Sequence, residues 1–147
     1  MKELTGGCLC GEVTYSIPDK IKYSGYCHCS GCRKFSGSSF SVFAGVTQGD
    51  LKINSGENQI KYFEESESTI LGFCQNCGSS LFGVKPQTGL VHIRMGSLND
   101  APSLRPQVHV FVGSKADWDI VSDDLPQFEA GPPERKSVTE EGNVQDS

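Results

Sequence analysis

The sequence has no long apolar run, no hydrophobic leader and no excess of basic residues, and each absence excludes a class of protein. No apolar stretch approaches the roughly 20 residues of a membrane span, so we expect no membrane partner. Residues 1–7 contain no hydrophobic segment and no N-glycosylation sequon occurs, which argues against secretion. The formal net charge is −5, which argues against nucleic acid because phosphate binding needs a basic surface. We therefore expect a cytoplasmic protein in a reducing compartment.

Sustained helical periodicity is also missing. No segment keeps a 3.6-residue apolar period over three turns, and no internal repeat is present. Helix is limited to single turns at 30–35, with Ser30 as N-cap, and at 98–101. Short β-like runs separated by Gly, Pro, Asn and Asp dominate, so the predicted fold class is mainly β. The expected strands are 12–17, 22–29, 39–46, 51–53, 59–64, 69–74, 80–84, 90–95, 107–112 and 118–121.

The domain organisation follows from length and composition. The chain has 147 residues, of which 36% are hydrophobic and 21% charged, which is typical of one globular domain. From Gly131 onward, apolar residues are too sparse to offset the entropy lost on ordering the chain. We predict one globular domain over residues 1–130 and a disordered tail over 131–147, with a docking motif in the tail as the alternative.

What the sequence does have is cysteine, in an unusual distribution. Its seven cysteines are odd in number, C-x-C pairs close poorly as disulfides, and the compartment is expected to be reducing. Tight cysteine pairs in such a protein favour zinc over disulfides. The cysteines form three clusters, each beside glycine: Cys8-Leu9-Cys10, Cys27-His28-Cys29-Ser30-Gly31-Cys32 and Cys74-Gln75-Asn76-Cys77-Gly78.

The first and third clusters together make a complete metal site. A C-x-C arm and a C-x-x-C arm supply the four sulfur ligands of a closed tetrahedral zinc site. Such a site joins distant chain segments and acts as a staple. Structural zinc contributes roughly 10–16 kcal/mol at neutral pH, comparable with the whole stability of a domain. The predicted ligands are Cys8, Cys10, Cys74 and Cys77.

The remaining cluster supplies three ligands, Cys27, Cys29 and Cys32, from one short segment. Three protein ligands leave one coordination position open, which is the arrangement of a reactive zinc. The alternative is a second structural zinc whose fourth ligand comes from elsewhere. His28 alternates to the face opposite its neighbouring cysteines. His92 and His109 lie in strand-like runs, either as packed residues, as that fourth ligand, or as proton carriers near the metal.

The three clusters resemble those of the glutathione-dependent formaldehyde-activating enzyme family, which also includes centromere protein V. The resemblance covers about residues 5–129, and the clusters occur in the family's order. Members often carry an arginine just before the Phe-Cys of the third cluster, where this chain has Ile70-Leu71-Gly72. The resembling segments are Gly6–Gly11, Cys27–Ser38, Gly72–Ser79 and a closing segment, Val108–Lys115 with Trp118 and Leu125–Phe128.

The resemblance implies a fold of several small coiled antiparallel sheets stapled by zinc, shared with a zinc-bearing Rab chaperone and with methionine sulfoxide reductases. It implies two zinc ions per chain, a structural ion on Cys8, Cys10, Cys74 and Cys77 and a functional one on Cys27, Cys29 and Cys32. The implied activity is that of a carbon–sulfur lyase on a thiol–aldehyde adduct of the S-hydroxymethyl glutathione type. The thiol would bind at the open three-cysteine zinc.

Three further residues are candidates for roles in this chemistry. We favour His109 for proton transfer. Arg33 and Lys34 directly follow the cysteine triplet and could attract the carboxylate of a small-molecule thiol, with surface solubility as the ordinary alternative. The competing function is a non-enzymatic, zinc-stabilised binding module in which both metals are structural.

Overall fold

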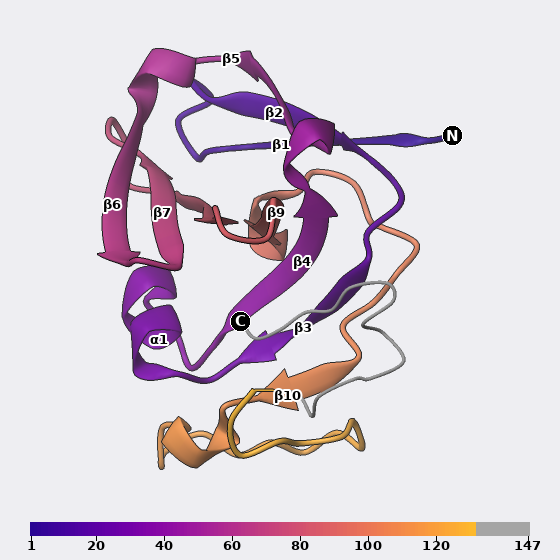
Figure 1. The fold of residues 1–147 in the computed structure, drawn as a ribbon, viewed down its shortest axis with the longest axis vertical. Helices are drawn as coiled ribbons and strands as arrows, with labels where there is room; N and C mark the ends of the chain where they lie inside the picture. Colours follow the sequence, from indigo (N-terminus) through magenta and orange to yellow (C-terminus); the bar gives the residue numbers. More distant parts are fainter. Residues whose placement is uncertain (132–147) are drawn as a thin grey trace. The chain divides into compact units, whose positions relative to one another are not determined.

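Residues 1–131, which the computed structural model describes, are mainly β, with two sheets and one α-helix (Figure 1). The predicted fold class is thereby confirmed. The predicted tail lies, apart from Gly131, outside the described residues. Within residues 1–131, no helix is long and apolar enough to cross a membrane. The described residues form two compact units, Met1–Ser24 with Val42–Pro106, and Gly25–Ser41 with residues 107–131.

The first unit contains most of the strands, all of them paired antiparallel. One sheet has the order β1-β2-β5, formed by β1 (Glu3–Gly7), β2 (Thr14–Pro18) and β5 (Lys52–Ser55). Another run of strands has the order β4-β9-β8-β7-β6. Its members are β4 (Ser41–Thr47), β6 (Ile60–Ser66), β7 (Thr69–Cys74), β8 (Ser80–Lys85) and β9 (Leu90–Arg94). Short 3-10 turns lie at Gln48–Asp50, Glu57–Gln59 and Met95–Ser97.

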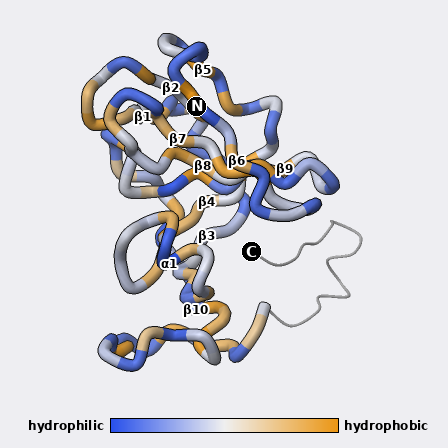
Figure 2. Tube along the Cα trace, turned by 90° about the vertical axis from the view of Figure 1, so that its left-hand side faces the viewer, coloured by the Kyte–Doolittle hydropathy of each residue, from blue (hydrophilic) through white to orange (hydrophobic). Residues whose placement is uncertain are grey.

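The hydrophobic core belongs to this first unit. Strand periodicity places alternate side chains on one face. Figure 2 shows that apolar and polar stretches follow one another along the chain. Tyr15 is fully buried, its hydroxyl lies 2.6 Å from Oγ of Ser97, and burial raises its pKa to about 12. Cys74 is part of the core, while Cys8 and Cys77 pack against it. The four-cysteine cluster therefore lies beside the core. The other core residues include Leu4, Val13, Ile17, Ala44, Val46, Leu81, Phe82, Val91 and Ile93.

The second unit carries the triplet of cysteines. The last three residues of β3 (Tyr23–Cys27) pair in parallel with β10 (Val108–Val110). The helix α1 (Ser30–Ser36) follows and ends at Gly37, whose φ of 69° is the left-handed conformation that closes a helix. After a 3-10 turn at Val112–Ser114, the chain returns along β10, where the amide of Phe128 donates to the carbonyl of His109 at 2.9 Å.

Some predicted boundaries differ from the structure. Strand β1 was not expected, because its last two residues are glycines, which are poor strand formers. Gly6 lies so close to Tyr15 that an added Cβ would be 2.4 Å from the ring, so the pair approaches where only glycine fits. The pair β3–β10 is parallel, an exception to the antiparallel sheets that the family resemblance implied.

The other differences lie in the second unit. The predicted strand at 107–112 stops at Val110, since Phe111 has a φ of 58° that breaks the extended alternation. The predicted strand at 118–121 does not form; this stretch contains a turn in which the amide of Asp119 donates to the carbonyl of Ala116 at 3.1 Å. The helix is capped by Cys29 rather than by Ser30.

Candidate functional site

The four cysteines of the first and third clusters converge in the first unit. Their sulfur atoms all lie within 4.8 Å of one another, with 3.6 Å between Cys8 and Cys10 and 3.8 Å between Cys10 and Cys74. Main-chain amides donate to two of them, from Val13 to Cys8 Sγ at 3.2 Å and from Cys10 to Cys77 Sγ at 3.4 Å. Four convergent sulfurs with amide donors are a donor set that a tetrahedral metal ion fits.

The surroundings lower the pKa of two thiols in this cluster. The hydroxyl of Ser79 and the amide of Cys10 lower the pKa of Cys77 to about 5. Burial acts to raise the pKa of Cys8, but the amide of Val13 and the thiol of Cys10 outweigh it, so the pKa is lowered. Burial raises the pKa of Cys74 to about 11. A bound cation would stabilise all four as thiolates.

The second cluster lies in the second unit, where β3 passes into α1. Cys27 ends the strand, Cys29 caps the helix and Cys32 lies in its first turn, and their sulfurs also lie within 4.8 Å of one another. The amide of Cys32 donates to Sγ of Cys29 at 3.3 Å. The thiols of Cys27 and Cys32 lower the pKa of Cys29 to about 2, whereas the contact with Cys29 and then burial raise the pKa of Cys27. Cys29 and Cys32 are only partly buried, so an ion held here could be reached by a small molecule.

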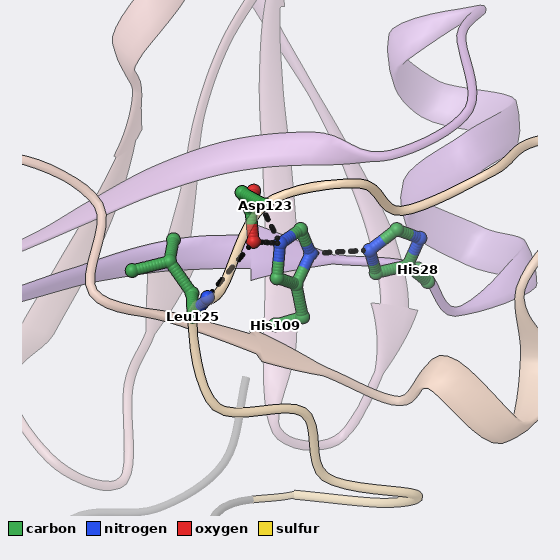
Figure 3. A network of polar contacts seen from close by, with 4 residues as sticks. All are labelled: His28, His109, Asp123 and Leu125. Carbon is green, nitrogen blue, oxygen red and sulfur yellow. Dashed lines mark hydrogen bonds and ion pairs between the residues drawn. The ribbon is translucent and has the colours of Figure 1, made fainter.

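A chain of three polar side chains lies in the same unit (Figure 3). His28, between two of the cysteines, is fully buried, and its Nε2 lies 2.9 Å from Nδ1 of His109. Nε2 of His109 lies 3.1 and 3.0 Å from Oδ1 and Oδ2 of Asp123. The amide of Leu125 donates to Oδ1 of Asp123 at 3.0 Å and holds the carboxylate in place.

Aromatic rings hold the two histidines. Tyr26 stacks on His109, with 4.7 Å between ring centroids, and Phe40 meets His28 edge-on at 5.3 Å. Burial and the charges of His109, Lys115 and Arg33 lower the pKa of His28, against an opposing effect of Asp119. The hydrogen bond from His109, and then that from Leu125, lowers the pKa of Asp123. His28 is therefore neutral near pH 7 beside an ionised Asp123.

The residues predicted to bind substrate, Arg33 and Lys34, lie in α1, and the residue predicted to transfer a proton, His109, lies in β10. Both ring nitrogens of His109 are engaged, one by His28 and one by Asp123. Arg33 lies in α1, half-buried, and its Nε donates to the carbonyl of His28 at 3.4 Å. Lys34, the next residue, is exposed. Arg33 and Lys34 thus share the unit of the three-cysteine cluster.

His92, the other histidine weighed as a ligand or proton carrier, belongs to the first unit. It is buried on β9, and its Nε2 lies 2.8 Å from the hydroxyl of Tyr23. The ring of Phe43 stacks on it at 5.0 Å, and burial holds its pKa well below the usual value. These contacts account for His92 as a packed residue.

Asp123 was not found from the sequence. It follows a serine and precedes another aspartate in a polar loop, and nothing in that local pattern distinguishes it from an exposed acidic residue. The alternating sequence pattern predicts that His109 lies in a strand, but it does not indicate which residue bonds either ring nitrogen of His109. Only the fold brings residues 28, 109 and 123 together.

Fold and cysteine geometry define a mainly β protein with two cysteine clusters, of four and three residues, that are able to bind metal. A comparison with models of protein families shows to which family the chain belongs. The model of the GFA family, described as glutathione-dependent formaldehyde-activating enzyme, matches residues 3–114, and the chain belongs to this family. The matched range includes all seven cysteines as well as His28 and His109.

Known relatives are distant. The chain is 30% identical over 78 residues to a protein of Aspergillus flavus and 24% identical over 111 residues to one of Colletotrichum graminicola. Both are provisionally named glutathione-dependent formaldehyde-activating enzyme. The alignments cover 52% and 73% of this chain but only 41% and 58% of the two relatives.

Among solved structures, a Rhodobacter sphaeroides protein has a similar fold. The TM-score is 0.56 at 18% identity, over 67% of this chain and 91% of that one. At this identity the similarity concerns the fold alone.

Proposed function

We propose that this chain is a zinc-dependent carbon–sulfur lyase that makes or cleaves a thiol–aldehyde adduct of the S-hydroxymethyl glutathione type. One zinc ion would be structural, on Cys8, Cys10, Cys74 and Cys77, and one catalytic, on the triplet, where the thiol would bind. The observation that carries the proposal is the triplet itself. Cys27, Cys29 and Cys32 supply three convergent sulfurs, one fewer than a closed zinc site requires.

The division of labour between the clusters follows from their donor sets. The four-sulfur cluster is complete and packs against the core, which suits a structural ion. In the triplet, two of the three cysteines are only partly buried, and no fourth Cys, His, Asp or Glu among residues 1–131 joins the group. Zinc bound there would supply Lewis acidity and hold a substrate thiol as thiolate.

The chain's own residues would handle the proton. In the direction of adduct formation, the proton leaves the thiol sulfur for the pair His28–His109. The sulfur electron pair forms the bond to the aldehyde carbon, and the C=O π electrons move to the oxygen. That oxygen then takes the proton back from the histidine pair, so no other reactant is consumed. Cleavage of the adduct follows the same steps in reverse.

Recognition of the thiol would rest on α1. Arg33 is held by its bond to the carbonyl of His28, which keeps its charge next to the segment that carries the triplet. The exposed Lys34 adds a second positive charge. A thiol bearing a carboxylate suits such a pair. Since this chain has Ile70-Leu71-Gly72 where members of the family often carry arginine, we propose a carboxylated thiol as the class and glutathione as its first member to test.

The test measures adduct turnover at equilibrium. Glutathione, formaldehyde and S-hydroxymethyl glutathione exchange without enzyme, and the protein should accelerate that exchange in an NMR magnetisation-transfer experiment. Cys29→Ser should remove one zinc ion per chain and the acceleration, while circular dichroism stays that of the wild type. Cys77→Ser serves as the contrast, since it should remove the other ion and unfold the chain.

Two results would contradict this scheme. If Cys29→Ser and Cys77→Ser unfold the protein alike, the two clusters have the same role and the chain is better explained as a binding module with two structural ions. If the wild type holds two ions but accelerates exchange of no carboxylated thiol, the lyase proposal is wrong.

A further inference from the structure

In the series of hydrogen bonds between His28, His109 and Asp123, Nδ1 of His28 is a ring nitrogen without a hydrogen-bond partner among the described residues. The side chain of His28 is fully buried, and its Nε2 is occupied by His109. A buried polar atom without a partner costs free energy, so such an atom marks a place where a ligand or water completes the site. In Figure 3 this nitrogen points away from His109 and Asp123.

The direction of the hydrogen bonds decides what that nitrogen can do. The carboxylate of Asp123 only accepts hydrogen bonds, so Nε2 of His109 must carry the proton that lies between them. Between two uncharged imidazole rings, the bare Nδ1 of His109 accepts from Nε2–H of His28. With its proton on Nε2, a neutral His28 presents a bare Nδ1. Asp123, at one end of this series of hydrogen bonds, thus sets the tautomer of His28 at the other end.

We infer that Asp123 is a positioning residue that acts through His109 to make Nδ1 of His28 a hydrogen-bond acceptor for the substrate. The inference rests on the proposed function for the identity of the substrate, whose thiol or hydroxyl proton would be the donor. His28 is then the member of the pair that touches substrate. His109, with both nitrogens occupied, acts through His28.

One isosteric substitution can reverse the direction of these hydrogen bonds. In Asp123→Asn, the amide of Leu125 still needs an acceptor, so the Asn carbonyl oxygen takes the place of Oδ1. The Asn NH₂ then replaces Oδ2, which at 3.0 Å is the nearer of the two oxygens to Nε2 of His109, and donates to that nitrogen, while the carbonyl oxygen in the place of Oδ1, 3.1 Å away, is occupied by the amide of Leu125. His109 must carry its proton on Nδ1 and donate to Nε2 of His28, which leaves a proton on Nδ1 of His28. The acceptor becomes a donor with no ring removed.

Asp123 suits this test because its side chain is 45% exposed, so the fold should tolerate the substitution. The experiment uses ¹⁵N-histidine-labelled, metal-loaded protein, in which protonated and bare ring nitrogens have well-separated ¹⁵N shifts. The wild type should show bare Nδ1 and protonated Nε2 on His28, and Asp123→Asn should exchange the two. In the same preparations, kcat for adduct exchange should fall by roughly 10²-fold with KM for the thiol unchanged. Asp124→Asn removes the same charge from the neighbouring exposed residue and should change neither readout.

Several outcomes would overturn the inference. Protonated Nδ1 in the wild type would mean that His109 carries a proton on both nitrogens, or that another group, such as the buried Oδ2 of Asp119, sets the tautomer. An unaltered His28 in Asp123→Asn would mean that Asp123 does not control it. Exchange of the two shifts with kcat unchanged would show that the acceptor has no part in turnover. If the wild type has no activity, the proposed function fails separately, and the ¹⁵N shifts alone decide whether Asp123 sets the tautomer.

Discussion

The sulfur of Cys10 lies 3.8 Å from that of Cys74, although 64 residues separate the two in the chain. The contact joins the loop after β1 to the end of β7, so an ion bound there closes a long loop. An ion that binds only the folded state stabilises it by its free energy of binding, so the gain in stability is set by the affinity for the metal. The first unit's stability should therefore depend on the metal.

We expect Cys77→Ser to unfold the protein, because it removes one of four sulfurs from an ion that contributes roughly 10–16 kcal/mol, comparable with the whole stability of a domain. Urea unfolding monitored by tryptophan fluorescence and circular dichroism, with zinc per chain measured on the same samples, checks this. Ser80→Ala, a nearby change outside the cluster, is the control. A Cys77→Ser protein as stable as wild type would show that the fold does not need the metal.

A second prediction concerns access to the triplet. In protein substituted with cobalt(II), a carboxylated thiol should change the absorption bands of the ion on Cys27, Cys29 and Cys32, since a further sulfur enters its coordination. Cys32→Ser should abolish the response because the ion is lost. The bands of the four-sulfur site should stay unchanged in both proteins. Complete indifference of the wild-type spectrum to thiols would contradict an open position.

The hydrogen bond between the partly buried Tyr23 and the buried His92 gives a third prediction. Tyr23→Phe removes the hydroxyl that lies 2.8 Å from Nε2 of His92 and leaves a buried nitrogen without that partner. The expected loss is about 1–3 kcal/mol in the free energy of unfolding. Tyr62→Phe, on a side chain that is 50% exposed, should cost less than about 0.5 kcal/mol. Equal effects of the two changes would mean that the contact with His92 contributes nothing.

Much of this arrangement could be predicted because cysteine spacing is local. A C-x-C or C-x-x-C pair converges on its own, so the grouping of Cys8 with Cys10 and of Cys74 with Cys77 needs no knowledge of the fold. Most strands likewise follow from short alternating runs such as 69–74 and 90–95. The mainly β class was therefore within reach of the sequence.

What the sequence could not supply depends on distant contacts. The bond between His28 and His109 spans 81 residues, and that between His109 and Asp123 depends on how the chain returns along β10. The left-handed conformation of Phe111, which ends β10, is rare for an aromatic residue and has no local signal. Similarly, β1 exists because Gly6 can lie against Tyr15, a packing relation that propensity cannot show.

The last prediction concerns pH and the anchoring of β1. Oδ2 of Asp100 accepts from the amide of Thr5 at 2.7 Å and from its hydroxyl at 3.0 Å, and these bonds lower the pKa of Asp100 below its ordinary 3.8. The unfolded state then binds the proton more tightly than the folded state, so the carboxylate stabilises the fold above pH 3.8 and this contribution is lost as pH falls through the lower, folded pKa. Asp100→Asn should therefore be less stable than wild type at pH 6, and the gap should narrow toward pH 3. Urea unfolding of both proteins at each pH, with Asp124→Asn as the charge-matched control, measures the gap directly and subtracts any metal loss common to all three. A gap independent of pH would show that the amide and hydroxyl of Thr5 do not favour the ionised carboxylate, because only a difference in proton affinity between the two states can make it vary.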